Sequence, residues 1–100
     1  MTYTIQYKPQ ALNDIEGVID YIEKELFAPL AAERFAKGLF ATIDKLRMNA
    51  GIFAISTLQD VLCYESNART VGYKKFTIIY SVHGNKVIVH RIIHGSLIIK

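Results

Sequence analysis

The fold of this 100-residue chain is decided by three consecutive segments, Phe76-Thr77-Ile78-Ile79-Tyr80-Ser81-Val82, His83-Gly84-Asn85 and Val87-Ile88-Val89-His90-Arg91-Ile92-Ile93. In the first segment every second residue, beginning with Phe76, is large and apolar, which places these residues on one face of a strand. The third segment is β-branched except for one histidine and one arginine, and β-branched residues favour strands. The glycine of the middle segment can adopt the positive φ of a tight turn. The sequence therefore predicts a β-hairpin over residues 76–93.

Two further strands are predicted before this hairpin. Residues 2–7 alternate between apolar and polar side chains, with Tyr3, Ile5 and Tyr7 on one side, as in a half-buried strand. Residues 69–73 form a short strand directly before the hairpin. The stretch 52–67 mixes polar and apolar residues without a clear period. It predicts a loop with one short helical turn or an irregular strand.

Two amphipathic helices are predicted between the first two strands. Apolar residues recur every three or four positions over residues 9–26, and again from Pro29 to a stop at Asn49-Ala50-Gly51. Pro9 and Pro29 each suit the first turn of a helix, where a missing N–H costs nothing. The corner Phe27-Ala28-Pro29 is so short that the two helices must lie antiparallel, as a helical hairpin.

Two glycines, Gly17 and Gly38, fall in the middle of the predicted helices. A glycine inside a helix costs about 1 kcal/mol relative to alanine. We therefore expect a close helix–helix or helix–sheet contact at both positions, because such a contact would offset that cost.

The order of elements is β-α-α-β-β-β, without repeats, linkers or low-complexity segments. It predicts an α+β fold, in which an antiparallel sheet of about four strands carries an α-helical hairpin packed on one face. The length favours one domain spanning residues 1–100. A hydrophobic fraction of 51% supplies the core that such a domain needs.

Charge is distributed unevenly along the chain. Residues 66–100 contain no Asp or Glu but carry six Lys or Arg and three His, whereas the first fifty residues hold six basic and seven acidic side chains. The basic excess therefore coincides with the predicted β-meander. A sheet of one charge sign suits a polyanionic partner such as RNA, DNA or an acidic protein segment.

Several classes of protein are excluded by composition. No apolar run reaches the roughly 18 residues that span a bilayer, and Met1-Thr-Tyr-Thr-Ile lacks the layout of a signal peptide. The one cysteine, Cys63, allows neither an intrachain disulfide nor a thiolate cluster for zinc. We therefore expect a soluble cytoplasmic protein that needs no membrane, metal or cofactor.

The ordered set of segments resembles the RelE/ParE superfamily of toxins from type II toxin–antitoxin systems, and most of all its ParE-like, plasmid-stabilisation branch. The resemblance covers nearly the whole chain and is weak between residues 51 and 67. It rests on Ala11-Leu12-Asn13-Asp14-Ile15, Ile19-Asp20-Tyr21-Ile22, Ala32-Glu33-Arg34-Phe35, Ile43-Asp44-Lys45-Leu46, Arg69, the strand quoted above from Phe76, and Val87-Ile88-Val89-His90-Arg91-Ile92-Ile93-His94-Gly95.

Members of this superfamily are small basic proteins that arrest bacterial growth and are held inactive by a cognate antitoxin. RelE-like members cut mRNA in the ribosome, whereas ParE-like members are associated with poisoning of DNA gyrase. The resemblance thus implies an antitoxin partner and either gyrase or the ribosome with its mRNA as target. It leaves both a homodimer and a toxin–antitoxin hetero-oligomer open.

Three residues are candidates for catalysis if the chain is a RelE-like, metal-independent endoribonuclease. Arg69 and Arg91 lie where the family places arginines, and both could clamp a phosphate. His94 falls near the family's C-terminal acid/base position, and an ordinary pKa of about 6.5 suits proton transfer. Together with the arginines, Lys74 and Lys75 are candidates for binding an anion or a protein partner.

This nuclease set is incomplete. Residues 56–67 contain no lysine, although RelE-like enzymes place catalytic lysines there, and no tyrosine follows Tyr80. The sequence therefore favours a ParE-like toxin that binds gyrase and is not an enzyme. The alternatives are a ribosome-dependent mRNA endoribonuclease and a non-toxic relative that keeps only the antitoxin-binding groove.

Each candidate also has a structural interpretation. Arg91 and Arg69 could satisfy a sheet edge, or pair with an acid of the first helix. His90 and His94 share one strand face with Ile88 and Ile92 by period two, which is typical of partly buried structural residues. Lys74 and Lys75 could be a solvated strand entrance, and a metal site is not expected.

The segment Leu97-Ile98-Ile99 is an apolar run. Because exposed apolar side chains favour association, we expect it to dock on its own domain, or to pass into a second copy or the antitoxin. The alternative interpretation is a disordered tail.

Overall fold

The computed structural model describes residues 2–95, so the prediction for residues 97–99 lies outside the described part of the chain. The elements are, in order, β1 (Thr4–Tyr7), α1 (Pro9–Asp20), the π-helical turn η1 (Tyr21–Glu25), α2 (Pro29–Asp44), α3 (Leu46–Asn49), the 3₁₀ turn η2 (Ala50–Ile52), α4 (Gln59–Leu62), β2 (Arg69–Tyr73), β3 (Phe76–His83) and β4 (Lys86–His94). The predicted β-α-α-β-β-β order is confirmed. The predicted helical turn between the helices and the second strand is α4.

The four strands form one sheet in the order β1-β4-β3-β2. β2, β3 and β4 are an antiparallel meander, as predicted. The prediction of a wholly antiparallel sheet was wrong for one pair, because β1 lies parallel to β4, with Tyr7 opposite Val89. Alternating side chains define the faces of a strand but not the direction of its neighbour, so this pairing has no local signature.

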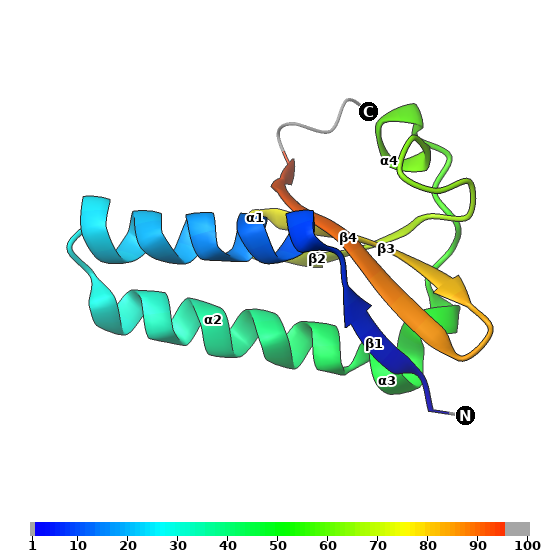
Figure 1. Cartoon of the computed structure of the whole chain (residues 1–100), viewed down its shortest axis with the longest axis horizontal. Coiled ribbons are helices and arrows are strands. Elements are labelled where there is room, and N and C mark those ends of the chain that lie inside the picture. The colour runs from blue at the N-terminus through cyan, green and yellow to red at the C-terminus, as the bar shows by residue number, and fades with distance from the viewer. Residues whose placement is uncertain (1, 96–100) are drawn as a thin grey trace.

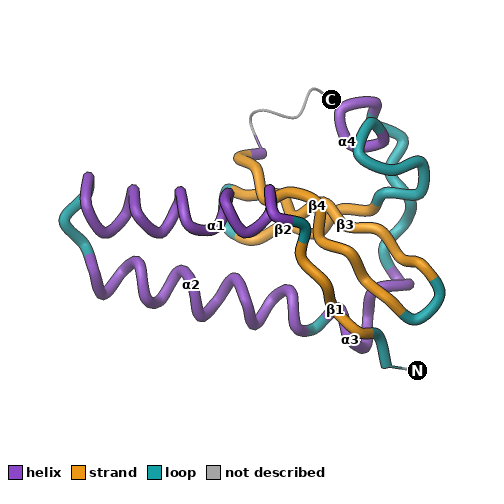
Figure 2. The backbone as a smooth tube through the Cα atoms, in the orientation of Figure 1, coloured by secondary structure: helices purple, strands orange, loops and turns teal. Residues whose placement is uncertain are grey.

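The helical hairpin packs on one face of the sheet and extends well beyond it (Figure 1). Figure 2 shows the same arrangement, with the two long helices on one side of the orange strands. As predicted, alternate residues of β3 face the helices, and Ile78 and Tyr80 are fully buried in the core that joins the two layers. The main core consists of Ala11, Ile15, Phe35, Leu39, Ile43, Leu46, Ala50, Ile78, Tyr80, Val87, Val89 and Ile92.

A β-bulge interrupts the pairing of β3 with β4. Tyr80 is opposite Val89 while Ile79 is opposite Arg91, so His90 is an extra residue with no partner in the ladder. An extra residue shifts the alternation of faces by one position. The prediction that His90 and His94 share a face was therefore wrong: His90 hydrogen-bonds Ser81 on the face away from the hairpin, whereas His94 packs against Phe76 on the hairpin side.

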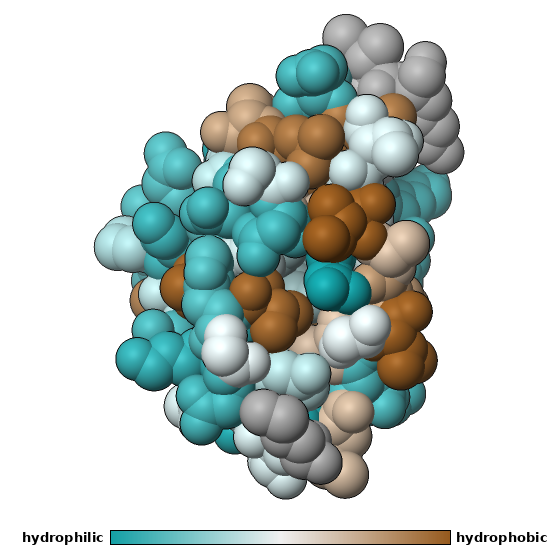
Figure 3. Space-filling view, turned by 90° about the vertical axis from the view of Figure 1, so that its right-hand side faces the viewer, coloured by the Kyte–Doolittle hydropathy of each residue, from teal (hydrophilic) through white to brown (hydrophobic). Residues whose placement is uncertain are grey.

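The second face of the sheet is covered by α4 and its flanking loops. A small core of Val61, Ala68 and Ile79 lies there, with Tyr64 and Ile93 packed against it. The end of the molecule that carries α4 and the N-terminal strand presents separate apolar patches among polar ones, without one continuous apolar face (Figure 3).

The two mid-helix glycines differ in their surroundings. A Cβ added to Gly38 would lie 2.1 Å from the hydroxyl oxygen of Tyr73, and that hydroxyl donates to the carbonyl of Phe35 at 3.1 Å. The predicted close helix–sheet contact is therefore confirmed at Gly38. It was wrong at Gly17, where an added Cβ would meet no atom within 4 Å.

Candidate functional site

Asp14 joins the first helix to the last strand. Because β1 ends at Tyr7, opposite Val89, no strand among residues 2–95 pairs with the edge of β4 beyond Val89. Asp14 of α1 takes that place, and its Oδ2 accepts the backbone N–H of Ile92 at 3.0 Å. Asp14 also accepts from Nε of Arg91 at 2.7 Å and from its Nη2 at 2.9 Å. One carboxylate therefore caps the open strand edge and holds the arginine in a bidentate pair.

The ion pair is only partly exposed, with 26% of the Arg91 side chain and 16% of the Asp14 side chain accessible. Hydrogen bonding to the Asp14 carboxylate holds the pKa of Arg91 above its ordinary value, against the opposing effect of burial. The structural interpretation of Arg91 as the partner of a first-helix acid is therefore confirmed. A guanidinium that is engaged in this way has fewer N–H groups to offer to an incoming phosphate.

Two hollows lie at the end of the sheet that carries Phe76, and the first of them lies beside this ion pair. One, of about 400 Å³, lies between α1 and β4 and includes Gly17, Tyr21, Arg91 and His94 in its lining. The other, of about 340 Å³, lies between the hairpin and the β2–β3 turn. Both are lined by Phe76, so we name them together the end groove, which is formed by Asn13, Asp14, Gly17, Val18, Tyr21, Ile22, Leu26, Ala31, Phe35, Lys74, Lys75, Phe76, Arg91, Ile92, Ile93 and His94.

Four of the five predicted site residues line the end groove, Arg91 and His94 in its first hollow and Lys74 and Lys75 in its second. His94 lies opposite Phe76 in the sheet, and the two rings are edge to face with centroids 5.5 Å apart. Lys74 and Lys75 form the turn between β2 and β3, and Lys74 adopts a positive φ of 53°. These two lysines line the second hollow, whose other lining residues are all apolar, and this combination suits an acidic and amphipathic partner.

Arg69 lies apart from the other candidates. It is opposite Tyr80 in the sheet, whose side chain lies in the hairpin-side core, whereas Arg91 is opposite Ile79, whose side chain lies in the core on the other face. Opposite residues of neighbouring strands share a face, so the two arginine side chains leave the sheet on opposite faces and are separated by the strand β3. That of Arg91 then turns round the edge of β4 to reach Asp14 of α1. The two arginines cannot clamp one phosphate together.

The side chain of Arg69 has a structural role, because it hydrogen-bonds the loop that follows the helical hairpin. Its Nη1 donates to the backbone carbonyls of Gly51, at 3.1 Å, and of Phe53. It thereby ties the loop after the helical hairpin to β2, beside the bridge between Ile55 and Arg69. The buried hydroxyl of Tyr80 donates to the carbonyl of Ala50 at 2.9 Å and holds the same segment.

Sequence reasoning allowed for a first-helix acid as the partner of Arg91 but did not identify Asp14 as that acid. A signal was present, because Asp14 is three residues after the buried Ala11 and next to the buried Ile15, on the side of the helix that faces the core. An acid in that position needs a buried partner. The partner, Arg91, lies 77 residues away and has no counterpart signal in its own segment.

Within residues 2–95, no group of three or more His, Cys, Asp or Glu side chains is placed to hold a metal ion. The helices in that range are all too short or too polar to cross a bilayer. Nothing in the described geometry therefore points to a metal centre.

The described chain is thus a small α+β domain, with a helical hairpin on one face of a four-stranded sheet and an apolar groove with basic residues in its lining at the end of the sheet. The chain belongs to the family described as the ParE toxin of the type II toxin–antitoxin system parDE, which it matches over residues 5–98. The family expected from the resemblance is thereby confirmed, and the protein is a ParE-type toxin of a type II toxin–antitoxin system.

Solved structures agree with this fold. The chain is similar to one from a chromosomal ParDE toxin–antitoxin system of P. aeruginosa, with a TM-score of 0.76, 18% identity and coverage of 93% of this chain and 96% of that one. It is also similar to a chain of the toxin–antitoxin complex RelBE2 from Mycobacterium tuberculosis, with a TM-score of 0.59, 12% identity and coverage of 94% and 99%. None of the curated protein sequences gives a significant match.

Proposed function

We propose that this ParE-type toxin arrests growth by binding DNA gyrase and that a cognate antitoxin neutralises it by occupying the end groove. In this proposal the toxin is a binding protein and not an enzyme. Its target and its antitoxin are cytoplasmic, and the pair would serve plasmid or chromosomal stabilisation.

The observation that carries the choice of gyrase over mRNA cleavage is the separation of Arg69 from Arg91. Metal-free RNA cleavage requires cations that converge on one phosphate together with an acid and a base. Here the two arginine side chains leave the sheet on opposite faces, and each is engaged within the protein. The expected catalytic lysines of residues 56–67 are also absent from the sequence.

The test of the target uses purified toxin in two assays. We expect inhibition of supercoiling by gyrase and no cleavage of ribosome-bound mRNA in a translating extract. Site-specific cleavage of mRNA that is abolished in His94→Ala would overturn the proposal and make His94 the general acid or base. Antitoxin binding without an effect in either assay would instead indicate a non-toxic relative.

The role of the end groove in antitoxin binding is tested by removing positive charges from its rim. Lys74 and Lys75 are on the rim of the end groove, and we expect an acidic antitoxin segment to associate faster at low salt. The association rate is measured between about 0.05 and 0.5 M salt for the natural chain and for Lys74→Gln/Lys75→Gln. A matched control is Lys45→Gln/Lys24→Gln, which removes the same charge from the hairpin.

We expect the salt dependence to weaken in the Lys74/Lys75 variant and to persist in the control. A flat response in the natural chain would remove the electrostatic part of the proposal. Equal losses in both variants would mean that net charge alone, and not the end groove, steers the antitoxin.

A further inference from the structure

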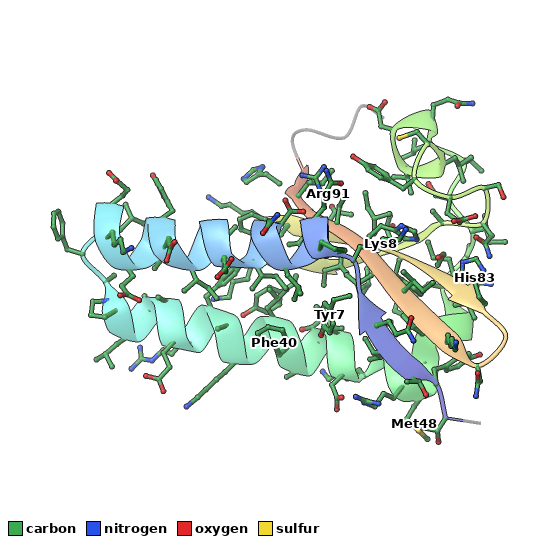
Figure 4. The ribbon with its side chains drawn as sticks, in the orientation of Figure 1. Tyr7, Lys8, Phe40, Met48, His83 and Arg91 are labelled. Carbon is green, nitrogen blue, oxygen red and sulfur yellow. The ribbon has the colours of Figure 1, made fainter. Side chains whose placement is uncertain are left out.

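A third pocket lies on the face of the sheet away from the end groove and plays no part in the proposed function. It has a volume of about 350 Å³ and is lined by Lys8, Pro9 and Gln10 at the start of α1, by Cys63 and Tyr64 after α4, and by His90 of β4. Figure 4 shows Lys8 at the junction of β1 and α1, on the side of the molecule that also carries His83. Three segments far apart in the sequence thus converge there.

The β-bulge directs His90 into this pocket. His90 is only 6% exposed, and its Nε2 lies 2.8 Å from Oγ of the fully buried Ser81. The same Ser81 oxygen lies 2.9 Å from Nε2 of His83, which is exposed at the end of β3. A chain of hydrogen bonds therefore connects the buried ring in the pocket with a histidine on the surface.

This series of hydrogen bonds limits which nitrogens of His90 and His83 can carry a proton at the same time. The hydroxyl of Ser81 has a single hydrogen, so it can donate to only one of the two Nε2 atoms and must accept from the other. If His90 is protonated, its Nε2–H donates to Ser81 and the Ser81 hydroxyl donates to neutral His83. In that state the ring of His90 is positively charged and its Nδ1–H is a second hydrogen-bond donor.

The charges around His90 favour an anion. Burial lowers the pKa of His90, Lys8 and His83 lower it further, and only Glu65 acts in the opposite direction. The pocket therefore places an ammonium group near an imidazole without a carboxylate among its lining residues. An anion between Lys8 and His90 would offset their mutual repulsion and stabilise the protonated ring.

We propose that this pocket binds a phosphate group, held between Lys8 and protonated His90, with Gln10 as a further hydrogen-bonding group in the lining. A phosphate oxygen accepts from Nδ1–H of His90 while the Ser81–His83 chain holds Nε2. Binding is accompanied by uptake of a proton at His90. Binding of the phosphate monoanion therefore strengthens as the pH falls.

The test follows the ring nitrogens of His90 by NMR while sodium phosphate replaces sodium chloride at constant ionic strength. We expect phosphate to raise the apparent pKa of His90 by about 1 unit, as an opposite charge nearby does. His94, on the hairpin side of the sheet, is the internal control and should not respond. Lys8→Gln should abolish the effect, whereas Lys37→Gln, which removes an exposed lysine of α2, should retain it.

Three probes distinguish the source of the phosphate group: inorganic phosphate, uridine 5′-monophosphate, and a short RNA with hydroxyls at both ends. A response to the first two assigns the pocket to phosphomonoesters, and a response to the RNA assigns it to backbone phosphates. No response to any probe in the natural chain, or an equal response of His90 in Lys8→Gln, overturns the proposal. Neither result depends on whether gyrase is the target.

Discussion

Replacing Asp14 should reveal how strongly α1 is held to the edge of β4. The carboxylate accepts three hydrogen bonds, two from Arg91 and one from the N–H of Ile92. Hydrogen bonds to charged groups contribute about 1.5–3 kcal/mol each, and those that share one carboxylate are not additive. We expect Asp14→Ala to lower the free energy of unfolding by about 2–4 kcal/mol, which includes the cost of leaving Arg91 partly buried without a partner.

The assay is a double-mutant cycle by urea unfolding with Asp14→Asn and Arg91→Met. We expect a coupling energy of about 1.5–3 kcal/mol. The control cycle is the pair of Glu33 with Lys37, whose side chains are 58% and 77% exposed, and which should couple by no more than about 0.5 kcal/mol. Equal coupling in the two cycles would refute the structural role that we assign to Asp14. A loss of gyrase inhibition in Arg91→Met beyond the loss of stability would show that Arg91 also contacts the target.

Three further predictions concern stability. Gly17→Ala should raise the free energy of unfolding by about 0.5–1 kcal/mol because the added Cβ enters open space. Gly38→Ala should lower the free energy of unfolding because its Cβ would meet Tyr73. We expect the thermal midpoints of the two variants to shift in opposite directions, and shifts of the same sign would contradict the described packing. Burial raises the pKa of Tyr80 to about 12. The stability that protonated Tyr80 contributes is therefore complete below its unfolded-state pKa of about 10 and is lost as the pH rises towards 12, by up to about 3 kcal/mol. In Tyr80→Phe the free energy of unfolding should fall less over this range. Burial lowers the pKa of His90 below 6.5. The stability that neutral His90 contributes is therefore complete above pH 6.5 and is lost as the pH falls through the folded-state pKa. In His90→Gln the free energy of unfolding should depend less on pH in acid, and an unchanged slope against pH would argue against a buried neutral imidazole.

The sequence alone determined the elements and their order. The alternating residues of β3, the helical stripes that begin at Pro9 and Pro29, and the turn at Gly84 are local patterns, each complete within one segment of the chain. For that reason the strands, the hairpin of helices and the ParE-like family could all be predicted. Lys74, Lys75 and His94 were also predicted to matter, and they share the end groove because the turn and the end of β4 are neighbours in any meander of these strands.

Only the tertiary structure decided the direction of β1, the partner of Arg91 and the face of His90. A period of two is the same for parallel and antiparallel neighbours, so the pairing of β1 with β4 could not be read from alternation. The bulge at His90 adds one residue without changing composition, yet it turns the histidine away from His94 and into another pocket. Arg91 and Asp14 meet across 77 residues, because a contact between distant segments depends on how the whole chain packs and not on either segment by itself.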